Sequence, residues 1–213
     1  YDFFSSGVKR IIFPSVYLAK IDLTNKYKNT AVWPFGDCPN LETIDSLDFV
    51  LNAVNEVPSE FLRRTIKLKT DVNLNYINKI GIASFNESSD GISFVYKNRI
   101  INIDHLGSEI VLAVDKNYLN LTNSSDDYGI MLYDSAFRGS KIKQAEIDKI
   151  INRFLNIPYN TFGDNKNISE LNINSNILIT ASLKYQKYNK INIQSDSLEV
   201  LEFDDKIFNI ESM

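Results

Sequence analysis

Apolar residues recur three and four positions apart in two stretches of the chain, which is the spacing of one helix face. The first stripe consists of Leu41, Ile44, Leu47, Leu51 and Val54, and the second of Ile147, Ile150, Ile151, Phe154 and Leu155. A candidate N-cap precedes each stripe, and a proline follows each. The pattern predicts two amphipathic helices, over about 41–56 and 140–155, with Lys143, Glu146 and Lys149 facing water on the second.

Elsewhere apolar and polar residues alternate, which is the spacing of a half-buried strand. Candidate strands cover residues 8–23, 65–74, 79–85, 91–97, 99–104, 109–115, 118–122, 129–137, 176–185, 189–194 and 197–203. Short polar turns separate most of them, and short connections favour antiparallel neighbours. Residues 157–175 are predicted to form a long polar loop, and no internal repeat is apparent.

These elements predict the fold class. The helices interrupt the run of strands instead of alternating with it, which favours an α+β fold over a parallel α/β fold. We expect a strand-rich single domain over residues 1–213, built as an antiparallel meander or sandwich with the two main amphipathic helices packed on one side.

Composition narrows the possible chemistry. The 213 residues are 44% apolar and carry a net charge of −4, which is ordinary for a globular protein. One cysteine excludes a disulfide framework and a multi-cysteine metal site, and one histidine excludes every motif that needs two. The 27 Ile and 25 Asn residues indicate an AT-rich genome. We therefore expect no metal and no cofactor.

Acidic charge gathers at the C-terminal end. Residues 195–213 hold six acidic residues and one basic residue, Lys206. Nucleic-acid binding needs a basic surface that neutralises phosphates, so this distribution disfavours a nucleic-acid partner. No apolar run approaches the ~20 residues that cross a bilayer, so we expect no membrane span. The compartment stays open, because a chain that begins at Tyr1 is compatible with the mature part of a secreted, viral or longer protein.

One segment contains the residue types of a hydrolase site. The sole histidine, His105, lies between Asp104 and Ser108, and Glu109 follows. A histidine, an acid and a hydroxyl can form a catalytic triad when separate elements bring them to one point. Here all four residues are close in sequence, and no G-x-S-x-G nucleophile turn occurs in the chain. A turn histidine between two strands is therefore the preferred interpretation, with catalysis by His105 as an alternative.

The same region resembles a zinc metallopeptidase motif. Residues 108–115, Ser-Glu-Ile-Val-Leu-Ala-Val-Asp, are similar to the helix H-E-x-x-H-A-x-D, with Ser108 and Leu112 in place of the two histidines and Glu109 retained. The resemblance implies a metal-free, degenerate zincin-like domain, of the kind that serves as a binding module in some bacterial toxins. The β-branched residues favour a strand at 108–115 instead. Active zinc chemistry is excluded, because neither Ser nor Leu is a useful zinc ligand.

Bases and aromatic residues alternate in residues 184–190. Tyr185 and Tyr188 are candidates for stacking on nucleic-acid bases or sugar rings, and Lys184, Lys187 and Lys190 are candidates for contacts with phosphate. Lysines at strand ends also discourage sheets from pairing edge to edge, and this is the preferred interpretation.

The functional prediction follows by elimination. We expect a non-enzymatic binding or structural module, either a docking domain or a component of a surface, secreted or virion assembly. Its expected partner is another protein, bound through a strand edge or an apolar patch. The alternatives are a hydrolase that uses His105, the degenerate zincin-like domain, and a nucleic-acid or glycan binder.

Overall fold

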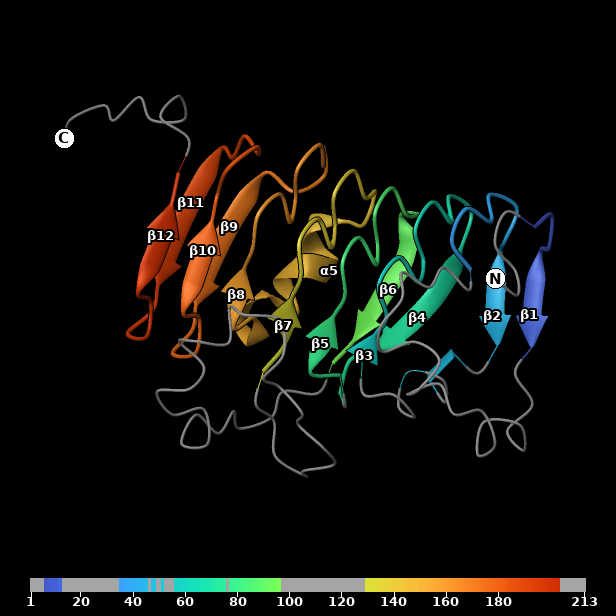
Figure 1. Cartoon of the computed structure of the whole chain (residues 1–213), viewed down its shortest axis with the longest axis horizontal. Coiled ribbons are helices and arrows are strands. Elements are labelled where there is room, and N and C mark those ends of the chain that lie inside the picture. Colours follow the sequence, from blue (N-terminus) through green and yellow to red (C-terminus); the bar gives the residue numbers. More distant parts are fainter. Residues whose placement is uncertain are drawn as a thin grey trace.

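The chain winds into successive coils that lie side by side. The computed structural model describes residues 6–12, 35–45, 47–48, 51, 56–75, 77–96 and 129–203. Within these residues every strand pair is parallel, and each strand lies next to the equivalent strand of the neighbouring coil (Figure 1). The fold of the described residues is therefore a β-solenoid.

The strands lie on two sides of the solenoid. Side A carries β3 (Glu56–Val57), β5 (Lys79–Ile80), β7 (Met131–Leu132), β8 (Asn156–Ile157), β10 (Thr180–Ser182) and β12 (Val200–Glu202). Side B carries β1 (Arg10–Ile12), β2 (Thr43–Asp45), β4 (Lys69–Asn73), β6 (Gly91–Val95), β9 (Glu170–Asn174) and β11 (Lys190–Gln194). Between β6 and β9, side B holds helix α5 (Gln144–Asp148) and a 3-10 helix (Ile151–Arg153).

A six-residue turn with one backbone conformation links side A to side B in four coils. The turns are residues 60–65, 83–88, 135–140 and 160–165. The first and fifth residues of each turn have positive φ angles, between 52° and 61°. Only one of these eight residues is a glycine, Gly139, and the left-handed conformation costs most other residues about 1–2 kcal/mol, although Asn160 and Asp164 adopt it more readily. Interactions between the stacked turns must therefore offset a repeated backbone cost.

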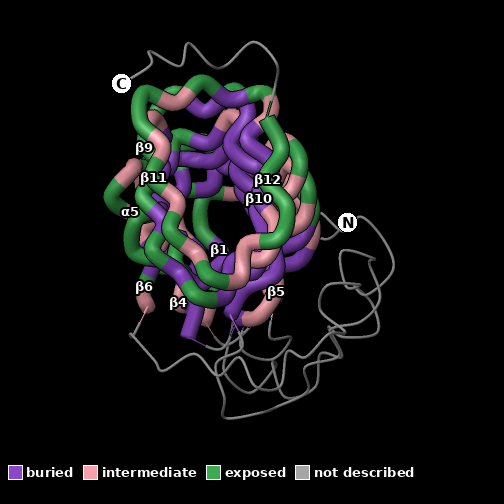
Figure 2. The backbone as a smooth tube through the Cα atoms, turned by 90° about the vertical axis from the view of Figure 1, so that its left-hand side faces the viewer, coloured by how far each residue is buried: buried purple, intermediate pink, exposed green. Residues whose placement is uncertain are grey.

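Backbone hydrogen bonds and aromatic rings join the turns. The Phe85 N–H donates to the Ala136 carbonyl at 2.8 Å, and the Phe137 N–H donates to the Thr161 carbonyl at 2.9 Å. This register places the third residues of the turns above one another. The Phe137 ring stacks on Phe85 at 5.2 Å and on Phe162 at 5.6 Å between centroids. All three rings are buried inside the coils, where Figure 2 shows the buried positions.

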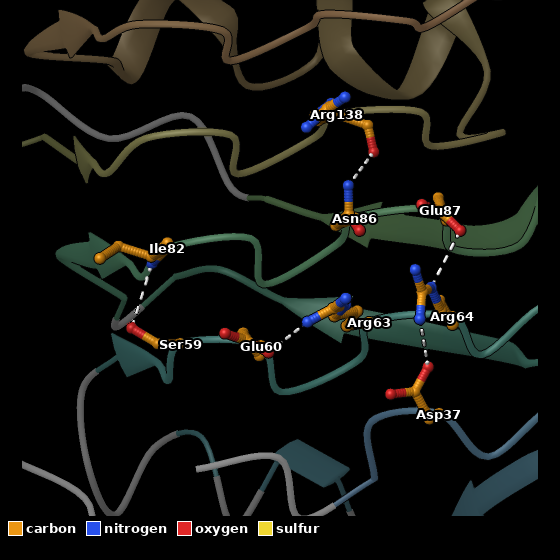
Figure 3. A network of polar contacts seen from close by, with 9 residues as sticks. All are labelled: Asp37, Ser59, Glu60, Arg63, Arg64, Ile82, Asn86, Glu87 and Arg138. Atoms are coloured by element: carbon orange, nitrogen blue, oxygen red, sulfur yellow. Dashed lines mark hydrogen bonds and ion pairs between the residues drawn. The ribbon is translucent and has the colours of Figure 1, made fainter. Parts of the chain in front are cut away.

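Charged side chains alternate along the outside of the same turns (Figure 3). The Arg64 guanidinium lies between Asp37, at 3.2 Å, and Glu87, at 3.0 Å, in the coils on either side. Further along, Arg138 pairs with Asp164 at 2.9 Å. These pairs are largely exposed, so each contributes no more than about 1 kcal/mol. They nevertheless favour one register of the coils, because a shift of one coil along the next separates the paired charges.

The helical segment replaces one strand of side B, and its side chains supply the hydrogen bonds of the missing backbone. The Phe94 N–H of β6 donates to the Glu146 carboxylate at 2.7 Å. On the other side, Gln144 Oε1 accepts the N–H groups of Ser169 and Glu170 at 3.0 and 3.2 Å, and Gln144 Nε2 donates to the Glu170 carbonyl at 3.0 Å. Each strand therefore bonds to one side chain of the helix, β6 through Phe94 and β9 through Glu170.

A buried arginine ties three coils together. Arg153 is 3% exposed, donates from Nη1 to the Leu74 carbonyl at 2.7 Å and places its guanidinium 4.2 Å from the Tyr96 ring centroid. Its own carbonyl accepts the Ile130 N–H at 2.7 Å. A side chain at Gly129 would lie 2.8 Å from this carbonyl. Arg153 thus contacts both ends of the interval 97–128, which lies outside the described residues.

The expected antiparallel meander or sandwich with two main helices is wrong. The predicted helix over 41–56 contains strand β2, with helical residues only at 47–48 and 51 in its described part. The predicted helix over 140–155 shrinks to the five residues of α5 and the 3-10 helix, and the predicted loop over 157–175 contains β9. Glu146, expected to face water, bonds to β6.

The physical reason lies in the turns. A short connection reverses the chain only when it makes a hairpin. Here the left-handed residues send the chain around a corner to the other side of the solenoid, and a complete coil returns it parallel to itself. The fifth turn positions are Asp37, Arg64, Glu87, Gly139, Asp164 and Tyr185, at intervals of 27, 23, 52, 25 and 21 residues. These unequal intervals hide the internal repeat from inspection of the sequence.

We predict that Phe137→Ala lowers the free energy of unfolding by about 3–5 kcal/mol, because it opens a cavity in the middle of the aromatic stack. Denaturant unfolding of the variant measures this loss. Ile82→Ala is the matched control, since Ile82 lies beside an adjacent turn but is 43% exposed. Equal effects of the two substitutions would contradict a stack that holds the coils together.

We predict that Glu146 stabilises the fold in a pH-dependent way. Burial raises the pKa of Glu146, but hydrogen bonds from Lys149 and from the Phe94 N–H outweigh burial and hold the pKa below the ordinary 4.5. The carboxylate therefore contributes stability above pH 4.5 that is lost as the pH falls through its folded-state pKa.

Unfolding free energies of the wild type and Glu146→Gln across this range measure the effect. We expect the wild type to be more stable by about 1–2 kcal/mol at neutral pH, and the difference to shrink in acid. Glu199→Gln, at an exposed carboxylate of the last coil, is the control. A gap between wild type and Glu146→Gln that stays constant with pH would contradict this role.

Candidate interaction surface at the C-terminal coil

Exposed apolar side chains gather at the C-terminal coil, defined here as residues 183–203. The exposed large apolar residues of the described part are Ile12, Ile66, Ile82, Val95, Tyr159, Tyr185, Val200, Leu201 and Phe203. Four of them lie in this coil, and a fifth, Tyr159, contacts Tyr185 with ring centroids 5.0 Å apart. Figure 2 looks onto this end of the solenoid and shows exposed positions along β11 and β12.

Residues of this coil are more exposed than the residues with which they pair in the preceding coil. Leu201 is 37% exposed, whereas Ala181, its partner on β10, is 1% exposed. On side B, Ile191 and Ile193 are half-buried, whereas their β9 partners Leu171 and Ile173 are 0% and 1% exposed. Among the described residues no strand lies beyond β11 or β12. Inward-facing positions that are buried in the preceding coil are therefore partly exposed in the C-terminal coil.

The backbone of β12 also has an outward-facing edge. The Val200 N–H donates to the Ile179 carbonyl, and the Glu202 carbonyl accepts the Leu183 N–H, so both residues bond toward β10. Neighbouring residues of a strand direct their backbone groups to opposite sides of that strand. The N–H and C=O of Leu201 therefore point away from β10, at the outer edge.

Acidic side chains flank this edge. Glu199 and Glu202 are exposed on either side of Val200 and Leu201, and Asp196 is exposed nearby. One cation lies close, because Lys184 Nζ is 3.5 Å from the Glu202 carboxylate. The outer edge of β12 thus combines exposed apolar side chains, the outward-pointing N–H and C=O groups of Leu201, and negative charge.

The two tyrosines proposed for stacking differ in their exposure to solvent. Tyr185 is 57% exposed, whereas Tyr188 packs against the core, and its burial raises the pKa of its hydroxyl. Lys187 and Lys190 are exposed, and Lys190 is in register with Glu170 of β9. Sequence reasoning missed Tyr159, which lies beside Tyr185 although the two are 26 positions apart. Only recognition of the repeated turn aligns these two segments.

The catalytic candidates lie outside the described residues. This applies to Asp104, His105 and Glu109, and to the zincin-like segment 108–115, so these hypotheses stay predictions. In the described part of the chain, no cluster of three or more His, Cys, Asp and Glu side chains has the arrangement of a metal site. None of its helices has the length and apolar character needed to cross a membrane.

Comparisons with known proteins give no relative: no family model, curated protein or solved structure matches the chain.

We predict that Tyr188 is a core residue and Tyr185 is not. Tyr188→Ala should lower the free energy of unfolding by about 2–4 kcal/mol, because it removes a ring packed against the core. Tyr185→Ala should cost less than about 1 kcal/mol, since that ring is mostly exposed. Thermal or denaturant unfolding distinguishes them, and a larger loss for Tyr185→Ala would contradict this assignment.

Proposed function

We propose that this chain is a non-enzymatic binding module that takes an extended segment of another protein onto strand β12. The observation that carries the proposal is the outer edge of β12, where the backbone groups of Leu201 point away from β10 and two apolar side chains are exposed. Such an edge accepts an added strand through backbone hydrogen bonds.

Charge defines the chemistry of the partner. Glu199 and Glu202 flank the apolar pair Val200 and Leu201. A segment with basic residues beside apolar ones therefore matches this edge in charge and in apolar character. Complementary charge raises the rate of encounter and sets the register of the added strand. We therefore expect the partner segment to alternate Lys or Arg with β-branched apolar residues.

The repeat architecture supports a binding role for this edge. In solenoids each coil contacts only its neighbours, and no strand of the described residues lies beyond β12. A partner strand on β12 makes the contacts that inner coils already make, without any rearrangement of the stack. The stacked turns supply the rigidity, because their backbone bonds and aromatic rings continue up to the coil before this edge.

The test uses a fluorescent eight-residue peptide, Lys-Thr-Val-Lys-Val-Thr-Lys-Val, titrated with the full chain at low and high salt. We predict saturable binding that weakens as salt rises, because the charge pairs lie at the surface. Leu201→Pro removes the outward N–H but leaves the β10 bonds of Val200 and Glu202 intact. It should weaken binding at least tenfold.

Charge reversal gives a second comparison. Glu199→Lys with Glu202→Lys should abolish binding of the peptide, whereas Glu170→Lys, at an exposed acid on β9, should leave it unchanged. The proposal fails if the peptide does not bind, or if it binds wild type and Leu201→Pro equally well.

A further inference from the structure

Strand β11 also has an outward-facing edge, on side B of the C-terminal coil. The Gln194 carbonyl accepts the Ser175 N–H, so the backbone of Gln194 bonds toward β9. By alternation along the strand, the backbone groups of Ile191 and Ile193 point to the outer edge. The side chains of these two residues are half-buried, whereas those of their β9 partners are buried. The C-terminal coil therefore presents two strand edges, one on β11 and one on β12.

The two edges differ in the sign of their charge. The charged residues within 187–194 are Lys187 and Lys190, whereas those within 196–202 are Asp196, Glu199 and Glu202. All five are exposed. In β11 a lysine stands beside two isoleucines at alternate positions, which is the chemistry that the acidic, apolar edge of β12 selects.

A second copy of the chain can bring its β11 to the edge of β12. Figure 2 looks onto this end of the solenoid and shows β11 and β12 on opposite sides of the coil, so the chain runs in opposite directions along them. A two-fold axis across this end places β12 of one copy beside β11 of the other, with antiparallel strands. The reciprocal contact forms at the same time, as in any two-fold interface. One arrangement thus pairs both outer edges of both copies.

The backbone sets the register of this contact. Two residues directly opposed in an antiparallel pair exchange both of their backbone hydrogen bonds when these groups face each other. Leu201 and Ile191 both direct these groups to the outer edge, and each is in register with a buried residue of the preceding coil. When these two residues are opposed across the contact, Glu202 of one copy lies opposite Lys190 of the other. The contact therefore joins apolar to apolar side chains and acid to base.

We propose that a second copy of this chain occupies the edge of β12, through its own β11, in a two-fold dimer. The inference rests on the binding edge proposed above and adds a means of regulating it. The dimer covers the edge that a partner segment needs, so self-association and partner binding compete by mass action. A rise in the concentration of the chain therefore lowers its apparent affinity for the partner segment.

Sedimentation equilibrium of the full chain over a range of concentrations tests the dimer. We expect a reversible equilibrium between monomer and dimer that shifts toward monomer as salt rises, because the charge pairs lie at the surface. The eight-residue basic peptide should shift the equilibrium toward monomer as well, because it competes for the edge of β12.

A charge exchange tests which strands meet. Glu199→Lys with Glu202→Lys makes both edges basic, and Lys187→Glu with Lys190→Glu makes both edges acidic. Each double variant should dimerise at least tenfold more weakly than wild type. An equimolar mixture of the two variants should dimerise again, because every contact then joins a basic edge to an acidic one. A mixture that stays monomeric overturns the proposed pairing.

The matched control is Lys141→Glu with Lys166→Glu, at two exposed bases outside the C-terminal coil. It removes the same positive charge from the chain and should leave the dimer unchanged. A loss of the dimer as large as that of the β11 variant would reduce the effect to net charge and overturn the inference.

Single cysteines test the register. The proposed register places Val200 opposite Asn192 of the second copy, with Cα atoms about 4.5 Å apart, within the range of a disulfide. A mixture of Val200→Cys and Asn192→Cys chains should oxidise to a cross-linked dimer, whereas neither variant alone should. The native Cys38 is fully buried and common to both. A cross-linked dimer from one variant alone would pair like strands and overturn the arrangement.

The inference and the proposed function fail in different ways. A chain that stays monomeric at every concentration but binds the peptide overturns the dimer and leaves the function proposed for β12 in place. A chain that does not bind the peptide even below the concentration at which it dimerises overturns the proposed function. The charge exchange and the cysteine pairs then still decide the dimer.

Discussion

The structure depends on one constraint, which is that the left-handed corner of each coil must lie in register with the corner of the next. The strained residues at positions 1 and 5 of the turns leave the third residue pointing inward and the backbone N–H groups pointing along the solenoid axis. Only in register do those groups find carbonyls and do Phe85, Phe137 and Phe162 stack. The strands on sides A and B are short, so they depend on these turns for their alignment.

The same constraint explains how the solenoid tolerates a helix within a row of strands. A missing strand leaves two edges of unpaired backbone groups, which would be costly to bury. Glu146 bonds to the Phe94 N–H at one edge, and Gln144 bonds to backbone groups of Ser169 and Glu170 at the other, while Ile147 is buried in the core. Arg153 then restores contact with the earlier coils through the Leu74 carbonyl and the Tyr96 ring. The stack is therefore continuous through side A and through the core, although side B is interrupted.

Much of the local structure was predictable, but not the way in which it assembles. The alternation at 189–194 and 197–203 predicted β11 and β12, and the apolar stripe of the second expected helix marked residues that are indeed buried, such as Ile147 and Phe154. Alternation reports which side chains face inward and is the same for parallel and antiparallel neighbours. The sequence predicted a strand edge or an apolar patch as the binding surface, without a location, and this stays a prediction. Its location on β12 requires knowing which of the described coils is the last one and which residues the inner coils bury.

The sequence by itself determined the strand-rich character, the apolar positions, the acidic C-terminal end and the scarcity of histidine and cysteine, which excludes metal motifs that need two or more of these residues. Only the tertiary structure decided that the strands are parallel, that Tyr188 packs against the core, that Tyr159 contacts Tyr185, and that Glu146 bonds to β6. The physical reason is the unequal length of the coils. Intervals of 21 to 52 residues separate equivalent turn positions. Residues that stack in space therefore follow no fixed period along the chain, and the hydrogen bonds between turns reveal the repeat.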